Sequence, residues 1–248
     1  MNDRGWALVT GAARRIGRAL ALASAEVGYD VIVHYRASAD DAEETARQVR
    51  ALGRSAHTAG MDLTDRGVGE RLLATAPGPA TLLVNCASVF EDDRIDTLTE
   101  EGLMGALAAN LRAPVLIAQA FAAALPAGRD GLIVNVIDQR VWRLTPQFFS
   151  YTLSKAALWA ATQTLAQALA PRIRVNAIGP GPTLASAYQA PADFTAEAAA
   201  VPLGHGASPR EIGEALRYLI GAPSVTGQMI AVDGGQHLAW QTPDTLGD

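Results

Sequence analysis

Short apolar runs alternate along the chain with longer stretches in which apolar residues recur every three or four positions. The short runs predict buried strands, and the longer period predicts amphipathic helices. The predicted strands lie at 6–9, 30–35, 81–84, 132–137, 172–179 and 228–232, and one more ends near 61–63. Strands that alternate with about six helices form parallel sheets covered on both faces. We therefore expect an α/β protein with a single doubly wound domain over 1–248 and a seven-stranded parallel sheet.

Capping residues mark several helix boundaries. Thr99 is expected to begin a long helix that runs through Asn110 to about Leu125. A buried asparagine inside an apolar helix needs hydrogen-bond partners and often marks a kink, a water site or a relay. Ser208 and Glu211 have the spacing of a capping box.

The stretch at about 184–206 is rich in alanine, proline and glycine and has no clear strand pattern. Loops of this length inside a compact domain usually have a function. We expect it to form a lid or loop over the substrate, with a short helix near 193–200.

Composition excludes several classes of protein. Hydrophobic residues make up 49% of the 248 residues and charged residues 18%, which favours a sizeable core over disorder. The net charge of −5 argues against a nucleic-acid partner. One cysteine and four scattered histidines predict neither a disulfide nor a metal site. The first apolar run begins by Trp6 and no run approaches a membrane span, so we expect no signal peptide, no membrane and a cytoplasmic location.

A glycine-containing turn separates the first strand from the first helix. Gly11 and Gly17 bracket this turn, and Gly28 is expected just past the end of the helix. A helix N-terminus presents free N–H groups and a positive dipole end, which bind a pyrophosphate. At the start of a strand–helix repeat, this arrangement indicates a dinucleotide site.

The end of the second strand indicates which dinucleotide binds. Chains that bind NAD usually carry an acid there for the ribose 2′-hydroxyl, whereas this strand ends in His34-Tyr35-Arg36 and is followed by Ser38. Arg36 and Ser38 suit a 2′-phosphate, so the missing acid favours NADPH. Asp62, after the third strand, is expected to bind the adenine amino group, to cap the next helix, or both.

Tyr151 and Lys155 lie four residues apart on a predicted helix and so share one face. A fixed cation next to a phenol favours the phenolate, and we expect Lys155 to lower the pKa of Tyr151. Asp138 ends a buried strand, at the edge where open α/β sheets place their sites. Taken alone, a Tyr-x-x-x-Lys pair is more often a half-buried tyrosine next to a solvated lysine.

The ordered set of motifs resembles the short-chain dehydrogenase/reductase superfamily, whose fold is Rossmann-like. The resemblance spans about residues 6–238 and rests on Thr10-Gly11, Asn85-Cys86-Ala87-Ser88, Asn110, Tyr151-x-x-x-Lys155, Pro180-Gly181 and Asp233-Gly234-Gly235. Two departures are informative. Arg15 stands where the family turn has its middle glycine, and Asp138 stands thirteen residues before the tyrosine, where the family has serine. Both are shared by the branch of pteridine reductases and dihydromonapterin reductases.

The resemblance to this branch implies NADPH-dependent hydride transfer to a C=N bond of a pterin. It implies that Tyr151 donates a proton to the ring nitrogen and that Lys155 holds the nicotinamide ribose. Asp138 would relay the proton of Tyr151, and it is expected to have a raised pKa because a carboxylate next to a phenolate is unfavourable. Asn110 would hold a water that links Lys155 to solvent.

The resemblance also implies the residues that bind the ligands. Arg15 would reach the pyrophosphate and the pterin, Ser88 would bond the pterin, and Phe90 would stack on it, although an isolated phenylalanine after a strand is commonly core. The implied cofactor-binding set is Gly11, Arg14, Arg15, Ile16, Gly17, His34, Tyr35, Arg36, Ser38, Asp62, Leu63, Asn85, Ala87, Ser88, Lys155, Pro180, Gly181 and Thr183. Family members are commonly homotetramers that pair long helices, here about 99–125 and 151–170.

Three alternatives remain open from the sequence. A carbonyl or beta-ketoacyl reductase would share the scaffold, but Asp138 counts against it. A non-catalytic NADPH-binding protein would not need the intact Tyr151 and Lys155. Reduction of folate-type substrates is the third, as a side activity.

Overall fold

Seven parallel strands form one sheet in the computed structural model, which describes residues 4–186 and 189–240. The strands are β1 (Trp6–Val9), β2 (Asp30–Tyr35), β3 (Ala56–Gly60), β4 (Ala80–Asn85), β5 (Gly131–Val136), β6 (Ile173–Pro180) and β7 (Met229–Val232). They lie in the order β3-β2-β1-β4-β5-β6-β7, and every neighbouring pair is parallel. The predicted seven-stranded parallel sheet is confirmed.

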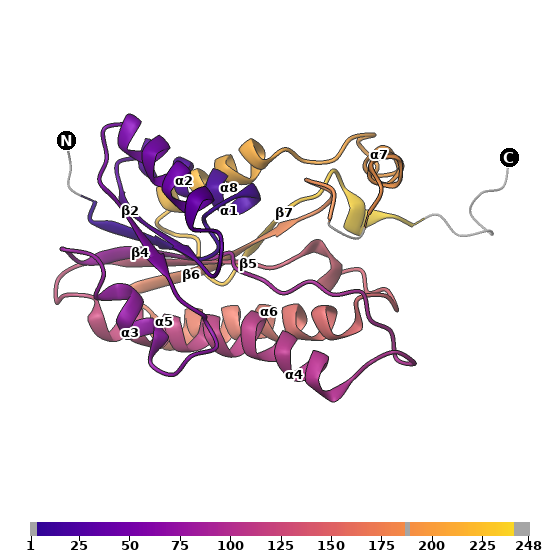
Figure 1. Ribbon diagram of the computed structural model, residues 1–248, viewed down its shortest axis with the longest axis horizontal. Coiled ribbons are helices and arrows are strands. Elements are labelled where there is room, and N and C mark those ends of the chain that lie inside the picture. The colour runs from indigo at the N-terminus through magenta and orange to yellow at the C-terminus, as the bar shows by residue number, and fades with distance from the viewer. Residues whose placement is uncertain (1–3, 187–188, 241–248) are drawn as a thin grey trace, which may run out of the picture.

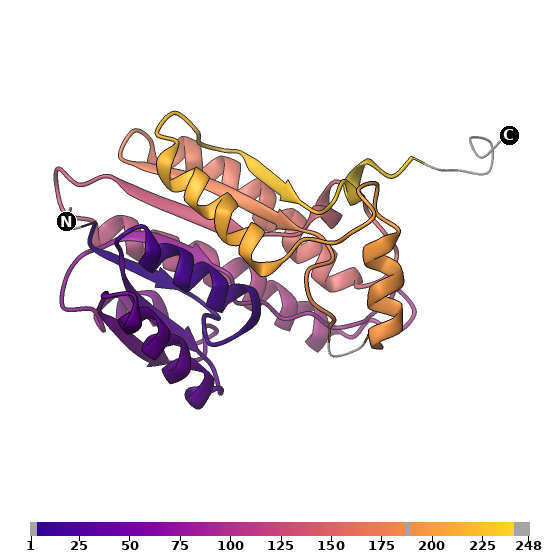
Figure 2. The same ribbon diagram turned by 90° about the horizontal axis from the view of Figure 1, so that it is seen from above.

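Helices cover both faces of the sheet, as predicted (Figure 1). The described residues form α1 (Arg15–Glu26), α2 (Ala39–Ala51), α3 (Val68–Leu73), α4 (Glu100–Leu107), α5 (Ala113–Ala124), α6 (Phe149–Leu169), α7 (Pro191–Ala199) and α8 (Pro209–Gly221). α1, α2 and α8 lie on one face, and α3, α4, α5 and α6 lie on the other. Seen from above, α7 lies beyond the end of the sheet toward which the arrow of β7 points (Figure 2).

The two helical layers bury alternate side chains of the same strands. In β1, Ala7 and Val9 pack into the core beneath α1, α2 and α8, whereas Trp6 and Leu8 pack into the core formed with α3 and α5. Because successive side chains of a strand point to opposite faces, a strand between two helical layers is buried along most of its length and is mainly apolar. This explains why the strands appear in the sequence as continuous apolar runs.

The long helix predicted at 99–125 is present but interrupted. Thr99 caps α4, and its Oγ1 accepts a hydrogen bond of 3.1 Å from the N–H of Gly102. A π-helical turn at Ala108–Arg112 then separates α4 from α5, so Asn110 lies at an irregular turn of a continuous helix. The whole stretch Glu100–Ala124 is long and apolar enough to cross a membrane, but 44% of its apolar window is buried and it packs on α3 and α6 as a core helix.

Two smaller predictions are confirmed and one is corrected. The capping box at Ser208 and Glu211 is present, and a short helix lies in the 184–206 stretch as α7, although residues 187 and 188 of that stretch lie outside the described residues. Asp62 does not cap the next helix: its Oδ1 accepts from the backbone N–H and the hydroxyl of Thr64, both two residues ahead. α3 begins later, after Gly67, because Asp62 stabilises a local turn instead.

The strand order places the candidate site. The chain winds outward from β1 to β3 and then returns to β4 on the other side of β1. At such a reversal the connections leave in opposite directions and open a crevice at the carboxyl ends of the strands. The turns after β1, β4 and β5 therefore lie along one edge of the sheet.

Candidate active site

A direct hydrogen bond joins Asp138 and Tyr151. Asp138 follows β5 and Tyr151 lies in the first turn of α6, and the Tyr151 hydroxyl donates to Asp138 Oδ2 over 2.9 Å. The other carboxylate oxygen, Oδ1, accepts a bond of 2.8 Å from the backbone N–H of Arg140. Asp138 thus has both a local role, as the cap of a one-turn 3-10 helix at Gln139–Val141, and a direct contact with the phenol.

Burial raises the pKa of both groups. The pKa of Asp138 is raised above its usual value by burial, and the N–H bond from Arg140 opposes the change only in part. The expected direction for the carboxyl is confirmed, but its cause is burial, because the hydrogen bond from Tyr151 lowers the pKa of Asp138. The pKa of Tyr151 is raised well above 10, first by burial and then by the charge of Asp138. Both side chains therefore keep their protons to higher pH than the same groups do in water.

Lys155 does not have the predicted effect on Tyr151. The ammonium donates a 2.8 Å bond to the carbonyl of Val136 and lies 5.6 Å from the centroid of the Tyr151 ring. Burial lowers its own pKa to about 8. The expectation that Lys155 lowers the pKa of Tyr151 is wrong for this arrangement, because burial and Asp138 dominate the phenol.

Asn110 joins the segment after β4 to α6. Its Oδ1 accepts from the N–H of Val89 at 2.8 Å and from the hydroxyl of Ser88 at 3.1 Å. Its Nδ2 donates to the carbonyl of Val89 and to the hydroxyl of Ser154, both at 2.9 Å. These four bonds use the full capacity of an amide side chain. The predicted water link from Asn110 to Lys155 stays a prediction, and the Asn110 side chain has no unused donor or acceptor with which to bind that water.

Aromatic rings surround the phenol. Phe90 meets the Tyr151 ring edge-on at 4.7 Å between centroids, and it stacks on Phe148 at 4.3 Å. The guanidinium of Arg140 lies 5.2 Å from the centre of the Phe148 ring. Asp93 fixes this side of the site, because its carboxylate accepts from the backbone N–H and the hydroxyl of Ser150 at the start of α6. Phe90 therefore lies next to Tyr151 as the substrate role requires, while the role itself stays a prediction.

The turn after β1 has the shape of a phosphate cradle. Gly11 has a φ of +65°, and a Cβ there would lie 2.9 Å from the Cα of Ala87. A Cβ on Gly17 would lie 2.0 Å from the carbonyl oxygen of Gly11, so only glycine allows the helix to start this close to the turn. No side chain caps the first turn of α1, which leaves its N–H groups available to an anion.

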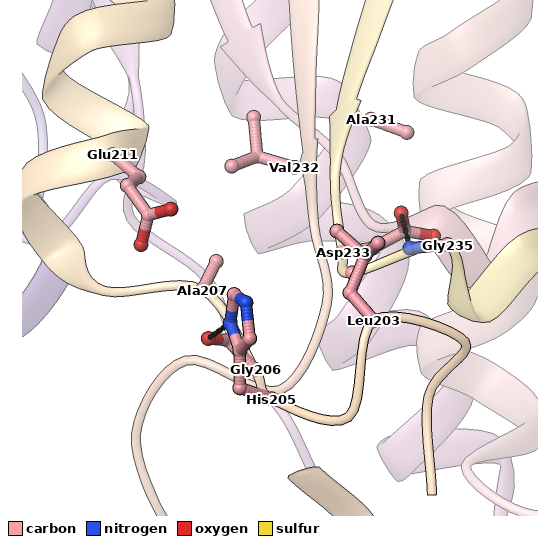
Figure 3. Close-up of a pocket in the computed structure, with 10 residues that line it drawn as sticks. Leu203, His205, Gly206, Ala207, Glu211, Ala231, Val232, Asp233 and Gly235 are labelled. Carbon is pink, nitrogen blue, oxygen red and sulfur yellow. Dashed lines mark hydrogen bonds between the residues drawn. The ribbon is translucent and has the colours of Figure 1, made fainter. Parts of the chain in front are cut away.

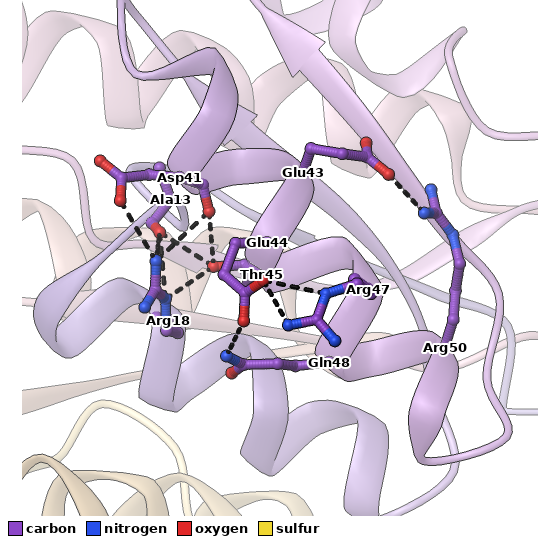
Figure 4. Close-up of polar contacts among 9 residues, drawn as sticks. All are labelled: Ala13, Arg18, Asp41, Glu43, Glu44, Thr45, Arg47, Gln48 and Arg50. Atoms are coloured by element: carbon purple, nitrogen blue, oxygen red, sulfur yellow. Dashed lines mark hydrogen bonds and ion pairs between the residues drawn. The ribbon is translucent and has the colours of Figure 1, made fainter.

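Polar contacts between α1 and α2 hold this turn in place (Figure 4). Arg18 donates to the carbonyl of Ala13 at 2.8 Å and to the hydroxyl of Thr45 at 2.9 Å. Thr45 in turn donates to the same carbonyl at 2.9 Å. Neither Arg18 nor Thr45 was predicted from the sequence, since nothing in the local pattern distinguishes them from ordinary surface positions of a helix.

His34 is a buried link rather than an exposed ligand. The N–H of Gly11 donates to its Nδ1 at 3.1 Å, and its Nε2 lies 3.0 Å from the carbonyl of Met61. These bonds require a neutral ring with the proton on Nε2. Burial lowers the pKa of His34 below its usual value, which favours this neutral form.

The predicted 2′-phosphate residues surround the end of β2. Arg36 is exposed just beyond the strand, Ser38 precedes α2, and Tyr35 packs its ring against Gly60. The bonds from Thr64, together with the charge of Arg36, lower the pKa of Asp62. The structure thus places an exposed cation, with no acid at the carboxyl end of the strand, where the ribose phosphate is predicted.

Arg14 and Arg15 differ in their contacts. Arg14 is exposed and lies 4.0 Å from the carboxylate of Asp41. Arg15 has a left-handed φ of 56°, a conformation that favours the glycine of the family pattern. Its guanidinium donates to the carbonyls of Leu184 and Ala185 at 3.2 and 2.9 Å. Arg15 therefore ties the dinucleotide turn to the start of the predicted lid.

Several predicted cofactor residues are buried in the scaffold. Asn85 is 3% exposed and donates to Asn135 at 2.9 Å. Ile16 and Leu63 pack against the two cores, and Thr183 donates back to the carbonyl of Gly181. At these positions the backbone, rather than the side chain, remains available to a ligand.

A surface pocket lies beside the chain that follows β7 (Figure 3). The end of β6 lies alongside, because Pro180 pairs with Val232 and the N–H of Gly181 donates to the Val232 carbonyl. His205, Glu211 and Asp233 are the ionisable residues of the lining, and the Asp233 carboxylate is already occupied by the N–H groups of Gly235 and His237 and by the His237 ring. The pocket is lined by residues other than Asp138, Tyr151 and Lys155. Among the described residues no cluster of acids, histidines and cysteines suits a metal ion.

Comparison with known proteins agrees with this geometry. Residues 11–237 match the family described as enoyl-(acyl carrier protein) reductase. The solved structure of FolM alternative dihydrofolate reductase 1 from Brucella suis in complex with NADP is 50% identical, with a TM-score of 0.92 over 96% of this chain and 97% of that chain. The angucycline C-6 ketoreductase LanV with bound NADP is 30% identical, with a TM-score of 0.87 over 96% and 97%.

Sequence relatives extend over the same length. The 3-oxoacyl-[acyl-carrier-protein] reductase FabG of Aggregatibacter actinomycetemcomitans is 31% identical over 92% of this chain and 97% of its own. An uncharacterized oxidoreductase of Mycobacterium tuberculosis is 34% identical over 92% and 90%. The chain therefore belongs to the short-chain dehydrogenase/reductase superfamily of oxidoreductases.

Proposed function

We propose that this oxidoreductase uses NADPH to reduce a C=N bond in the pterin ring of a dihydropterin or a dihydrofolate. The observation that carries the proposal is the hydrogen bond between Tyr151 and Asp138, at the position where the superfamily resemblance expects serine. FolM, at 50% identity, supports the pterin branch by its name, and it was crystallised with NADP.

The cofactor assignment rests on the chain's own residues. The uncapped first turn of α1 and the close approach of Gly11 and Gly17 fit a pyrophosphate. Arg36 fits a 2′-phosphate, since guanidinium groups bind phosphate with charge-assisted bonds. Bound NADPH supplies the hydride that adds to the ring carbon.

The acid–base pair accounts for the choice of substrate. Reduction of C=N adds a hydride to carbon and a proton to a basic nitrogen. Tyr151 delivers that proton, and Asp138, whose pKa burial raises, returns one to the phenol. A serine suits an uncharged carbonyl oxygen, whereas a carboxyl with a raised pKa suits a basic nitrogen. Phe90 gives a flat ring a face on which to stack.

The remaining roles belong to the same proposal. Lys155 holds the nicotinamide ribose, and its buried ammonium is already fixed by the carbonyl of Val136. Residues 184–206 act as the lid, tethered at their start by Arg15. The protein works in the cytoplasm as a homotetramer.

A ketoreductase is the second candidate, because FabG and LanV are similar to this chain over nearly its full length. The test is a panel of a dihydropterin, dihydrofolate and a beta-ketoacyl thioester, each assayed for NADPH oxidation. We expect turnover with the first two and little with the thioester. The reverse order would establish the ketoreductase, and NADPH binding without turnover of any substrate would leave a non-catalytic binding protein.

A further inference from the structure

Arg140 lies beside the acid–base pair of Asp138 and Tyr151, and the proposed reaction gives it no role. It is the second residue after Asp138, and its own N–H holds the Asp138 carboxylate at 2.8 Å. Its side chain leaves the same one-turn helix and reaches over Phe148. The backbone of Arg140 thus contacts the Asp138 carboxylate, and its side chain contacts the ring of Phe148.

The guanidinium is held by neutral groups. Its Nη1 donates to the hydroxyl of Thr145, and its carbon atom lies 5.2 Å from the centre of the Phe148 ring. Its Nε is buried without a hydrogen-bond partner. Within the described ranges 4–186 and 189–240, no carboxylate lies within ion-pair distance of Arg140. A half-buried cation of this kind is costly unless its field stabilises an anion elsewhere.

The aromatic stack transmits the position of Arg140 to the phenol. Phe148 has a left-handed φ of 54°, which is unfavourable for a bulky residue and is maintained by its surroundings. Its ring contacts both the guanidinium of Arg140 and the ring of Phe90. Phe90 in turn contacts the edge of Tyr151. Loss of the cation–π contact would therefore loosen the ring that supports the phenol.

Charged and titratable groups from three segments of the chain face the pair. The groups that face the pair are Lys155 from α6, Cys86 after β4 and Arg140. The thiol stays neutral, because burial raises its pKa to about 11. When Tyr151 gives its proton to the substrate and Asp138 returns one to the phenol, one negative charge is left on the buried pair. Arg140 and Lys155 are the cations whose charges lower the pKa of Asp138 and so favour that negative charge.

We propose that Arg140 is a positioning residue that orients Asp138 and Tyr151 and offsets the negative charge left when their proton passes to the substrate. The proposal rests on the proposed function for its chemical step. Arg140 acts in the direction that the proposal requires, since its charge lowers the pKa of Asp138 and of Tyr151 against the effect of burial.

The test compares Arg140→Gln, which removes the charge, with Arg140→Lys, which keeps it. Arg143→Gln is the matched control, because it removes the same charge from an exposed position three residues away. Arg140→Met is a second neutral variant that keeps the aliphatic stem over Phe148, and it serves if the glutamine variant does not fold. We measure kcat and KM against pH, the Kd of NADPH, and the carboxyl titration of Asp138 by NMR, assigned by its loss in Asp138→Asn.

In the neutral variants we expect kcat to fall about tenfold and the basic limb of the pH profile to move up by about one pH unit, the lower end of the shift that a neighbouring charge causes. The Asp138 titration should move in the same direction, the Kd of NADPH should stay unchanged, and Arg140→Lys should recover most of the loss. An unmoved profile and titration in a folded neutral variant overturn the proposal, as does an equal shift in Arg143→Gln. If no substrate is reduced, the proposed function fails, and the Asp138 titration still decides the role of Arg140.

Discussion

Replacing Asp138 separates its structural role from its chemical role. The Oδ1 atom caps the 3-10 turn through the N–H of Arg140, and the Oδ2 atom receives the Tyr151 hydroxyl. Asp138→Ala removes both acceptors and leaves a partly buried N–H without a partner, at a cost of about 1–3 kcal/mol. In a chain of this length each kcal/mol lowers Tm by about 2–4 °C.

Asp138→Asn keeps the cap and removes only the acid. Its amide oxygen can accept from Arg140, so the turn is retained. The ionised form of Asp138 opposes folding above its folded pKa, because burial raises that pKa above the unfolded value. An uncharged asparagine lacks this penalty. At neutral pH we therefore expect Asp138→Asn to melt at or above the temperature of the unmodified protein, and Asp138→Ala to melt below it.

The chemical effect should be the same in both variants. A single acid–base group contributes about 100- to 10,000-fold, which corresponds to about 3–5 kcal/mol of transition-state free energy. We expect kcat for the pterin to fall within this range in both variants, with NADPH affinity nearly unchanged. Asp138→Ser should restore the group of the ordinary superfamily and shift activity toward ketones.

The assay pairs kcat for each variant with its Tm and with the Kd of NADPH from a fluorescence titration. Loss of kcat in the stable asparagine variant would assign the acid role to Asp138. An unchanged kcat in a folded Asp138→Ala protein would refute it, and Tyr151 and Lys155 would then act without it. If kcat falls only in the variant whose Tm also falls, Asp138 acts as a turn cap and not as an acid.

Three further predictions concern the cofactor, the pH response and the assembly. Arg36→Asp should narrow or reverse the preference for NADPH over NADH, by roughly 10- to 150-fold for one charged hydrogen bond; comparable kcat/KM for both cofactors in the unmodified protein would contradict this. Burial lowers the pKa of His34 in the folded protein, so the neutral ring stabilises the fold fully above the pKa of about 6.5 in the unfolded chain, and this contribution is lost as pH falls through the folded pKa. Tm should therefore drop more steeply on acidification in the unmodified protein than in His34→Gln. Met104 on α4 and Leu153 on α6 are 57% and 44% exposed, so Met104→Glu should dissociate the proposed homotetramer of 25.9 kDa chains, and a monomer by light scattering at micromolar concentration before any substitution would refute the proposed assembly.

The fold was predictable because each strand lies between two apolar layers. That packing makes the strands continuous apolar runs and makes the helices periodic, so both appear directly in the sequence. Thr99 and Ser208 were predictable for the same reason, since a cap acts within three residues. The role of Asp62 was not predictable, because a local turn and a helix cap compete for the same carboxylate. The chain continues for several residues before α3 begins.

The site was only partly predictable. Asp138, Tyr151 and Asn110 were found from spacing and resemblance, and their contacts lie within one strand end and two helices. The pKa direction of Tyr151 was missed, because burial acts through the whole surroundings and not through the residue four positions away. Arg140 was missed although it is next but one to Asp138, since its importance depends on Phe148, whose ring position follows from a left-handed backbone.

The π-helical turn at Ala108–Arg112 contains one extra residue, which the candidate site needs and the packing of the helix does not. A π turn contains one residue more than an α turn spanning the same hydrogen bonds. Deleting that residue would close the turn into ordinary helix and leave the buried faces of α4 and α5 in register. Asn110 would then no longer reach the backbone of Val89. We therefore expect a chain with one residue deleted from this turn to keep its fold and to lose the link between Asn110 and Val89.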